Sequence, residues 1–169
     1  DTPDPQGGEI VRDGKTGEPT GILRDTAMDL VGRVIPPLSR EKRERAIRAA
    51  MRHAQELGVT SVQDNSSAED LAVYQELRRK GELGVRINAW RSADFAGDFQ
   101  RIGAAAPFGD AFLRLGTMKI FVDGSMGAGT ALFFAPYADD GATSGLAIHT
   151  QSELDGLVRE IDRAGLQIA

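Results

Sequence analysis

The sequence predicts an α/β fold built on parallel strands, and three observations lead to this prediction. Short apolar, strand-like segments alternate with amphipathic helical segments from about residue 39 to the end of the chain. Three of these strands end in polar or aromatic residues, at the edge of a parallel sheet where active sites form. With 169 residues, of which 41% are hydrophobic and 27% charged, the chain can bury one globular core.

Composition also narrows the classes of partner. The net charge of -5 argues against nucleic-acid binding, which needs a basic surface. Glu41 and Glu44 interrupt the one dense basic stretch, residues 40–52, which therefore indicates a solvated helix face. There is no cysteine for disulfides or thiolate metal sites, and no apolar run approaches the roughly 18 residues of a membrane span. No signal-peptide pattern opens the sequence, so we expect a soluble cytoplasmic protein.

The first 38 residues differ from the rest of the sequence. Within residues 9–24, two β-prone runs flank a turn at Gly14–Gly17, a pattern that predicts a β-hairpin. A Pro36-Pro37 break follows. We therefore expect residues 1–38 to form a hairpin and loop insertion, and residues 39–169 to form successive βα units of one domain.

Four helices are predicted within this second region, at about residues 39–58, 67–81, 94–102 and 152–165. Ser39, Ser67 and Ser152 are the expected N-caps, with acidic residues in the turn behind each. Gly58 and Gly81 end the first two helices. The periodicity of the apolar residues gives each helix one face for packing.

The intervening strands are predicted at about residues 59–64, 85–90, 115–122 and 166–169. Residues 123–152 make the connection from the third strand to the last helix much longer than the others, which places a functional loop at the carboxyl ends of the strands. Four βα units make about half of a (β/α)8 TIM barrel, which takes about 250 residues. No G-x-G-x-x-G follows the first clear strand, which argues against a dinucleotide-binding fold. We expect a central piece of a larger protein, with open strand edges that favour self-association.

The stretch TMKIFVDGSMGAGTA, residues 117–131, carries the most informative residue. Lys119 lies among strand apolar residues, where a charged amine is costly. If it points inward, burial favours the neutral amine, which can add carbon dioxide to become a carbamate, an anionic oxygen ligand for divalent metals. The alternative is a lysine that extends its ammonium group to the rim of the sheet.

Other candidate residues stand at the strand ends. Asp64, Trp90 and Ser125 are expected to contact substrate, and Asp123, on the same strand face as Lys119, is a candidate catalytic residue. His53 and His149 have no metal-ligand spacing, and no G-x-S-x-G elbow marks a serine nucleophile.

These segments resemble the amidohydrolase superfamily, in the amidohydrolase family 3 branch that includes N-substituted formamide deformylases. The stretch KIFVDGSMGAGTALFFAPYADDG is similar to that branch's K-I-F-x-D-G-S-x-G-x-x-T-A … P-Y-x-D segment. Two further stretches, GGEIVRDGKTGEPTGILRD and ELGVTSVQD, agree with its other segments. The resemblance runs over nearly the whole chain.

The resemblance implies a metallo-dependent hydrolase on a (β/α)8 barrel that cleaves carbon–nitrogen bonds of a small amide-type, non-peptide substrate. It implies one or two divalent metal ions, usually zinc, which activate a water molecule. Of the family's ligands only the carboxylated lysine carries over, onto Lys119. Gly129 stands where the family motif has an arginine, so a contact made by that arginine is in doubt.

The chain is therefore expected to be a catalytically incomplete part of a hydrolase. Two other classes remain open at this stage. One is a non-catalytic binding module on a degenerate barrel. The other is a lyase-like or aldolase-like barrel enzyme in which Lys119 acts as a base or forms a Schiff base.

Overall fold

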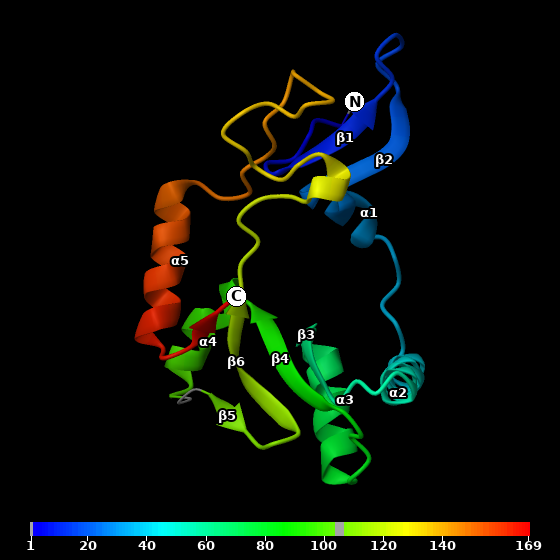
Figure 1. Cartoon of the computed structure of the whole chain (residues 1–169), viewed down its shortest axis with the longest axis vertical. Coiled ribbons are helices and arrows are strands. Elements are labelled where there is room, and N and C mark those ends of the chain that lie inside the picture. The colour runs from blue at the N-terminus through cyan, green and yellow to red at the C-terminus, as the bar shows by residue number, and fades with distance from the viewer. Residues whose placement is uncertain (1, 104–106) are drawn as a thin grey trace. The chain divides into compact units, whose positions relative to one another are not determined.

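The computed structural model describes residues 2–103 and 107–169 and has a mixed α/β fold. Two compact units divide the chain (Figure 1). Residues up to Pro37 join Phe121–Leu154 in the first unit, and Leu38–Ile120 join Asp155–Ala169 in the second. The first break lies beside the boundary predicted after residue 38. Phe121–Leu154, which contains the long loop, lies in the first unit, and the predicted division of the chain after residue 38 stays a prediction.

The second unit is built on a sheet whose main strands are parallel. Its neighbours are β3 (Ser61–Asn65), β4 (Arg86–Ser92), β6 (Leu113–Lys119) and β7 (Gln167–Ile168), in chain order. Each pairs in parallel with the next. A two-residue strand, β5 (Phe108–Gly109), pairs antiparallel with β6 and was not predicted. The predicted order and direction of the four main strands are confirmed, and closure into a barrel remains a prediction.

One face of this sheet is apolar and forms the core. The buried strand residues on it are Ile87, Ala89, Leu113, Leu115 and Met118. Helices α2 (Arg40–Glu56), α3 (Ala68–Arg79), α4 (Ala96–Arg101) and α5 (Gln151–Arg163) contribute further buried residues, namely Ile47, Met51, Val73, Leu77, Phe99 and Ile161. Full burial of each large apolar side chain stabilises the unit by roughly 1.5–3 kcal/mol.

The first two helix starts match the sequence prediction. Ser39 Oγ accepts a hydrogen bond from the Lys42 amide at 3.3 Å. Ser67 and Asp70 form a complete capping box at the start of α3. Both helices end at glycines with left-handed φ, 75° at Gly58 and 72° at Gly81, as predicted.

The cap of the last helix was assigned to the wrong residue. Thr150, and not Ser152, caps α5, because the Thr150 hydroxyl accepts from the Glu153 amide at 3.3 Å. The Glu153 carboxylate accepts from the Thr150 amide in return, at 2.8 Å. This capping box leaves Ser152 inside the first turn.

Two predicted strand ends were also wrong. The first strand begins at Ser61, because the Val59 amide donates to the Ala54 carbonyl oxygen and belongs to the end of α2. The third strand ends at Lys119 and not at Val122. Ile120 still donates to Ala169, but the Val122 carbonyl oxygen accepts from Ile148 in the long loop.

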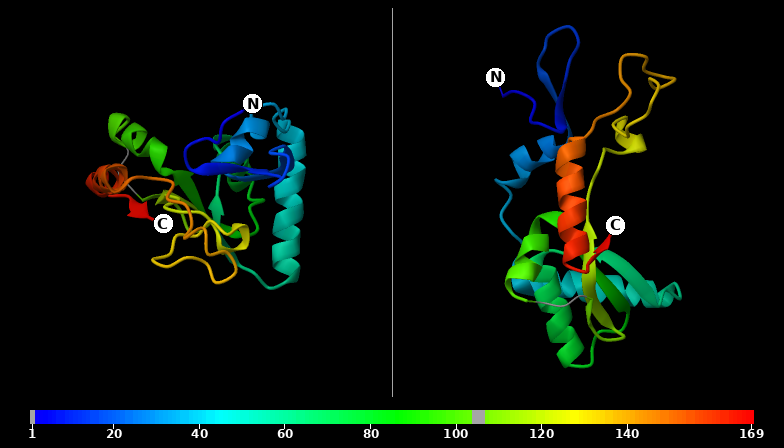
Figure 2. Two further views of the ribbon diagram at one scale, coloured as in Figure 1. Left: turned by 90° about the horizontal axis from the view of Figure 1, so that it is seen from above. Right: turned by 90° about the vertical axis from the view of Figure 1, so that its left-hand side faces the viewer.

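The first unit contains the predicted hairpin. Strands β1 (Gly8–Arg12) and β2 (Pro19–Asp25) pair antiparallel, and Figures 1 and 2 draw them as a two-stranded ribbon in blue. At the turn, the Asp13 carboxylate accepts hydrogen bonds from the amides of Lys15 and Thr16, both at 2.9 Å. A short helix, α1 (Asp29–Gly32), follows and was not predicted. None of the helices in residues 2–103 and 107–169 is long and apolar enough to cross a bilayer.

Removing the α3 cap should destabilise the protein measurably. In Ser67→Ala the capping box is lost, and with it hydrogen bonds to Asp70 and from Arg43, so we expect the free energy of unfolding to fall by about 1–2 kcal/mol. The matched control is Ser39→Ala, which loses a single cap bond at 3.3 Å and should cost less. Urea denaturation of both variants gives the comparison, and an equal cost would contradict it.

Candidate functional site

The parallel sheet has a polar face opposite its apolar core face. Strand pairing aligns Asn65 with Trp90, Trp90 with Thr117, and Thr117 with Gln167. Side chains alternate along a strand, and paired residues share a face. The polar face therefore carries these four residues near the carboxyl ends of the strands, on the side away from Ala89 and the other core residues.

Lys119 belongs to this polar face because of a register shift. Leu113 and Leu115 pair with Ile87 and Ala89 on the apolar face, but the next pair joins Trp90 to Thr117, so that Gly116 is an extra residue in β6. The shift turns fully buried Met118 toward the core and Lys119 toward the polar face. Without this bulge, the alternation that places Leu113 and Leu115 in the core would direct Lys119 at the helices.

The bulge requires a glycine. A Cβ atom added at Gly116 would lie 2.5 Å from the Cβ of Pro107, which is far inside van der Waals contact. The proline precedes β5, so the short antiparallel strand and the bulge are packed directly against each other. Close backbone approach is the physical reason for glycine at this position.

Lys119 and Trp90 contact each other on the polar face. Lys119 is half-buried, and its Nζ lies 5.8 Å from the centroid of the Trp90 ring, within the range of a cation–π contact. The sequence predicts two properties of Lys119, an inward orientation and a role as a metal ligand. The geometry places the side chain opposite the helices, and its chemistry remains a prediction.

Trp90 has an unusual polar atom. Its indole nitrogen, Nε1, is buried, and no residue in the described part of the chain accepts a hydrogen bond from it. An unsatisfied buried donor costs about 1–3 kcal/mol. Trp90 was predicted to contact substrate, and it is the predicted residue that shares the polar face with Lys119.

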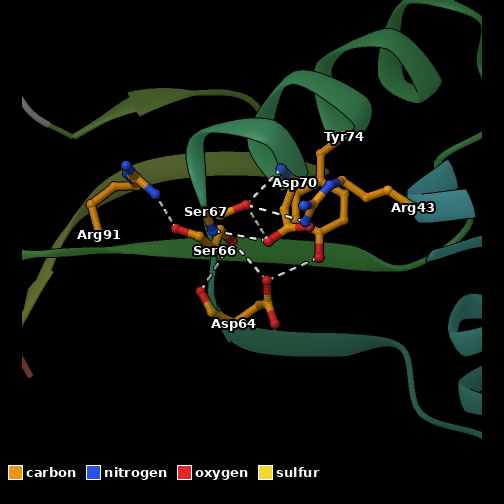
Figure 3. A network of polar contacts seen from close by, with 7 residues as sticks. All are labelled: Arg43, Asp64, Ser66, Ser67, Asp70, Tyr74 and Arg91. Carbon is orange, nitrogen blue, oxygen red and sulfur yellow. Dashed lines mark hydrogen bonds and ion pairs between the residues drawn. The ribbon is translucent and has the colours of Figure 1, made fainter. Parts of the chain in front are cut away.

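Asp64 lies on the other face of the sheet (Figure 3). Its carboxylate accepts hydrogen bonds from the Tyr74 hydroxyl at 2.9 Å and from the Ser66 hydroxyl at 2.7 Å. Burial, together with the bond to Asp64, raises the pKa of Tyr74 well above its ordinary value. The structure therefore does not bring Asp64 together with Trp90 and Lys119, and the neighbouring Asn65 occupies the polar face instead.

A second set of contacts fixes the end of β3 to the helices and to β4. Arg43 of α2 forms an ion pair with Asp70 of α3, and the guanidinium group of Arg91 donates to the Ser66 carbonyl oxygen (Figure 3). Burial opposes ionisation of Asp70, but hydrogen bonds from Ser67 and Arg43 outweigh it and lower the pKa of Asp70. Arg91 also stacks over the Phe95 ring at 4.7 Å. These charges support the strand ends and do not enter the polar face.

Asp123 and Ser125 lie in the loop of the first unit. The Asp123 carboxylate accepts from the Leu132 amide at 2.8 Å. Ser125 donates its amide to Thr130 Oγ1 at 3.0 Å and accepts from the Ala128 amide at 3.3 Å, so it caps the 3₁₀ turn Met126–Ala128. Both residues thus have structural roles within the loop, and their predicted catalytic and substrate contacts remain predictions.

The described residues do not form a complete metal site by themselves. Within residues 2–103 and 107–169, no three His, Cys, Asp or Glu side chains are grouped closely enough to hold a metal ion. His53 is exposed on α2 beside Glu56. Lys119 supplies at most one ligand, and a protein zinc site takes three or four.

Comparison with known proteins gives the class of this chain. Residues 1–169 match the sequence profile of the amidohydrolase family, so the chain belongs to this family. The chain is 33% identical to YtcJ of Bacillus subtilis (strain 168), which is named as an amidohydrolase, and 31% identical to Protein LONG AFTER FAR-RED 3 of Arabidopsis thaliana. Each match covers 99% of this chain but only 32% and 31% of the relative.

Two solved structures have the same arrangement. An uncharacterized metal-dependent hydrolase from Pyrococcus horikoshii is 30% identical, with a TM-score of 0.76 over 94% of this chain and 33% of that one. An uncharacterized metal-dependent hydrolase from Pyrococcus furiosus is 28% identical, with a TM-score of 0.67 over 84% of this chain and 30% of that one. The chain thus spans about a third of the length of the relatives it matches.

The sequence missed three residues of the polar face, Asn65, Thr117 and Gln167. Thr117 Oγ1 donates to Gln167 Oε1 at 3.4 Å, across the β6–β7 pair. The alternation of side chains along the first strand could have predicted the position of one of them, Asn65. Val62 is apolar, so Asp64 shares the core face with it and Asn65 points the other way.

The Tyr74–Asp64 contact should make stability depend on alkaline pH. Because the pKa of Tyr74 is raised in the folded state, its stabilisation is fully present below the ordinary tyrosine pKa of 10.0. It is lost as pH rises above that value, since the unfolded chain then releases the proton first. In Tyr74→Phe we expect a shallower fall of the free energy of unfolding above pH 10, measured by urea denaturation at several pH values.

The chain offers a matched control for this measurement. Tyr137 is the other tyrosine, and its hydroxyl donates to the Ala131 carbonyl oxygen at 2.7 Å in the loop. Tyr137→Phe should keep the slope that depends on Tyr74. If Tyr74→Phe and the wild type lose stability equally above pH 10, the assigned contact has no role in it.

Proposed function

We propose that this chain is part of a metal-dependent hydrolase acting on carbon–nitrogen bonds of a small amide-type, non-peptide substrate. The observation that supports this most directly is the position of Lys119, which ends a parallel strand on the polar face of the sheet. Membership of the amidohydrolase family and the metal-dependent hydrolases among its structural neighbours support the same class.

We further propose that Lys119 is carboxylated and contributes an oxygen ligand to one or two divalent metal ions, with zinc as the expected metal. The described residues alone do not fit a metal site. The proposed site is therefore larger than this set of residues, and residues 1–169 on their own are proposed to be catalytically incomplete. The relatives, about three times as long, are consistent with this proposal.

Several finer features complete the proposal. The sheet would form about half of a (β/α)8 barrel, with residues 1–38 as a hairpin insertion. Similarity to N-substituted formamide deformylases suggests that an N-substituted amide is the first substrate class to assay. Asp123 and Ser125 would act from the long loop, and the protein would be cytoplasmic and associate with copies of itself.

Substitution of Lys119 is the direct test. In the full-length protein, Lys119→Ala should lose the metal that the lysine binds and slow the hydrolysis of N-substituted amides by orders of magnitude, since one anionic ligand is removed. Metal analysis of the purified protein and rates with added zinc provide the two measurements. The control is His53→Ala, a change at an exposed helix residue, which should leave both unchanged.

Two results would contradict the proposal. One is full metal occupancy with a near-normal rate in Lys119→Ala. The other is activity that does not depend on metal, accompanied by a borohydride-trapped adduct between Lys119 and a carbonyl substrate. That second result would favour the Schiff-base alternative.

A further inference from the structure

The proposed function does not explain the position of Trp90 or its buried indole N–H group. Its ring faces the Lys119 amine at 5.8 Å, and its N–H group is buried without an acceptor in the described part of the chain. A ring contact alone does not account for this N–H group, since phenylalanine would give an aromatic face without the cost of a buried donor.

The neighbours of Trp90 on the polar face do not satisfy this donor. Register places Asn65 and Thr117 beside it on the two adjacent strands. Neither accepts from its indole nitrogen, although both carry oxygen atoms. Thr117 instead pairs with Gln167 at 3.4 Å. The described residues therefore leave the indole N–H group without an acceptor, in a ring whose centroid lies 5.8 Å from the Lys119 amine nitrogen.

We propose that Trp90 is the positioning residue of Lys119, and that its indole N–H donates a hydrogen bond to a carbamate oxygen formed on Lys119. This inference rests on the proposed function, because it takes Lys119 as the carboxylated residue. Before the reaction the ring would hold the ammonium form of Lys119 through the cation–π contact, and afterwards the N–H group would stabilise the product anion. A hydrogen bond from a neutral donor to an anionic oxygen is among the stronger hydrogen bonds in proteins.

The chemical step is balanced with carbon dioxide as the second reactant. The lone pair of the neutral Lys119 amine attacks the carbon of carbon dioxide, and a nitrogen–carbon bond forms. One carbon–oxygen π pair moves onto oxygen, and the nitrogen releases one proton to water. The product carries one negative charge shared by two oxygen atoms, one of which accepts from Trp90 in this proposal.

The first experiment observes the indole proton itself. In a ¹H–¹⁵N NMR spectrum of the full-length protein, the Trp90 indole resonance is the one that disappears in Trp90→Phe. Addition of ¹³C-bicarbonate should move this resonance downfield, the direction of a stronger hydrogen bond. The shift should be absent in Lys119→Arg, which keeps a positive charge but does not form the carbamate.

The second experiment measures the carbamate. Its ¹³C signal, assigned by its absence in Lys119→Arg, should appear in the wild type. In Trp90→Phe the bicarbonate concentration needed for half occupancy should rise by about tenfold or more, the loss expected for one hydrogen bond to a charged group. The matched control is Tyr74→Phe, which removes a hydroxyl donor from the opposite face of the sheet and should leave carbamate occupancy unchanged.

Each other outcome overturns the inference. If the carbamate forms while the indole resonance stays in place, or if Trp90→Phe keeps wild-type occupancy, Trp90 does not position it. If acetate moves the resonance and bicarbonate does not, the acceptor is a bound carboxylate instead. If the wild type forms no carbamate, the inference fails with it, and metal-dependent hydrolysis by Lys119→Ala then decides separately whether the proposed function stands.

Discussion

The single-residue bulge at Gly116 is the constraint on which the candidate site depends. Upstream of the bulge, Leu113 and Leu115 point to the core face of the sheet, where they are buried. Downstream, the alternation is reversed, so that Met118 is fully buried and Lys119 points to the polar face. An α/β protein needs its apolar strand face covered, and this bulge allows β6 to keep Met118 in the core while Lys119 faces the polar side.

The sequence predicted the regular part of this fold because its signals are local. Serine caps, left-handed glycines and apolar periodicity identified α2 and α3 and the order of the parallel strands. The register shift has one local signal, the glycine inside the strand, but the contact between Gly116 and Pro107 comes from tertiary packing outside the strand. Side-chain alternation predicted that Lys119 and Asp123 share one strand face, but β6 ends at Lys119, so the alternation does not extend to Asp123.

For the site residues too, the sequence identified candidates, whereas the contacts that each side chain makes depend on the tertiary fold. The sequence singled out Asp64 and Trp90 at strand ends and Lys119 as a lysine among apolar strand residues, but it did not assign Asp64 and Trp90 to opposite faces of the sheet. Tyr74 and Ser66 occupy the carboxylate of Asp64 on the core side, and Arg91 is held by Ser66 and Phe95. Asp64 and Arg91 therefore stabilise the fold at these strand ends, and Lys119 is the charged residue of the three that faces the polar side of the sheet.

The long loop forms most of its hydrogen bonds within itself. Asp123, Ser125 and Thr130 bond to neighbouring loop residues, and the Phe133 amide donates to the Ser144 carbonyl oxygen at 2.7 Å. The conformation of such a loop is held mainly by its own hydrogen bonds. Substitutions within it can therefore change the surface that the loop presents without altering the hydrogen bonds that pair the strands of the sheet.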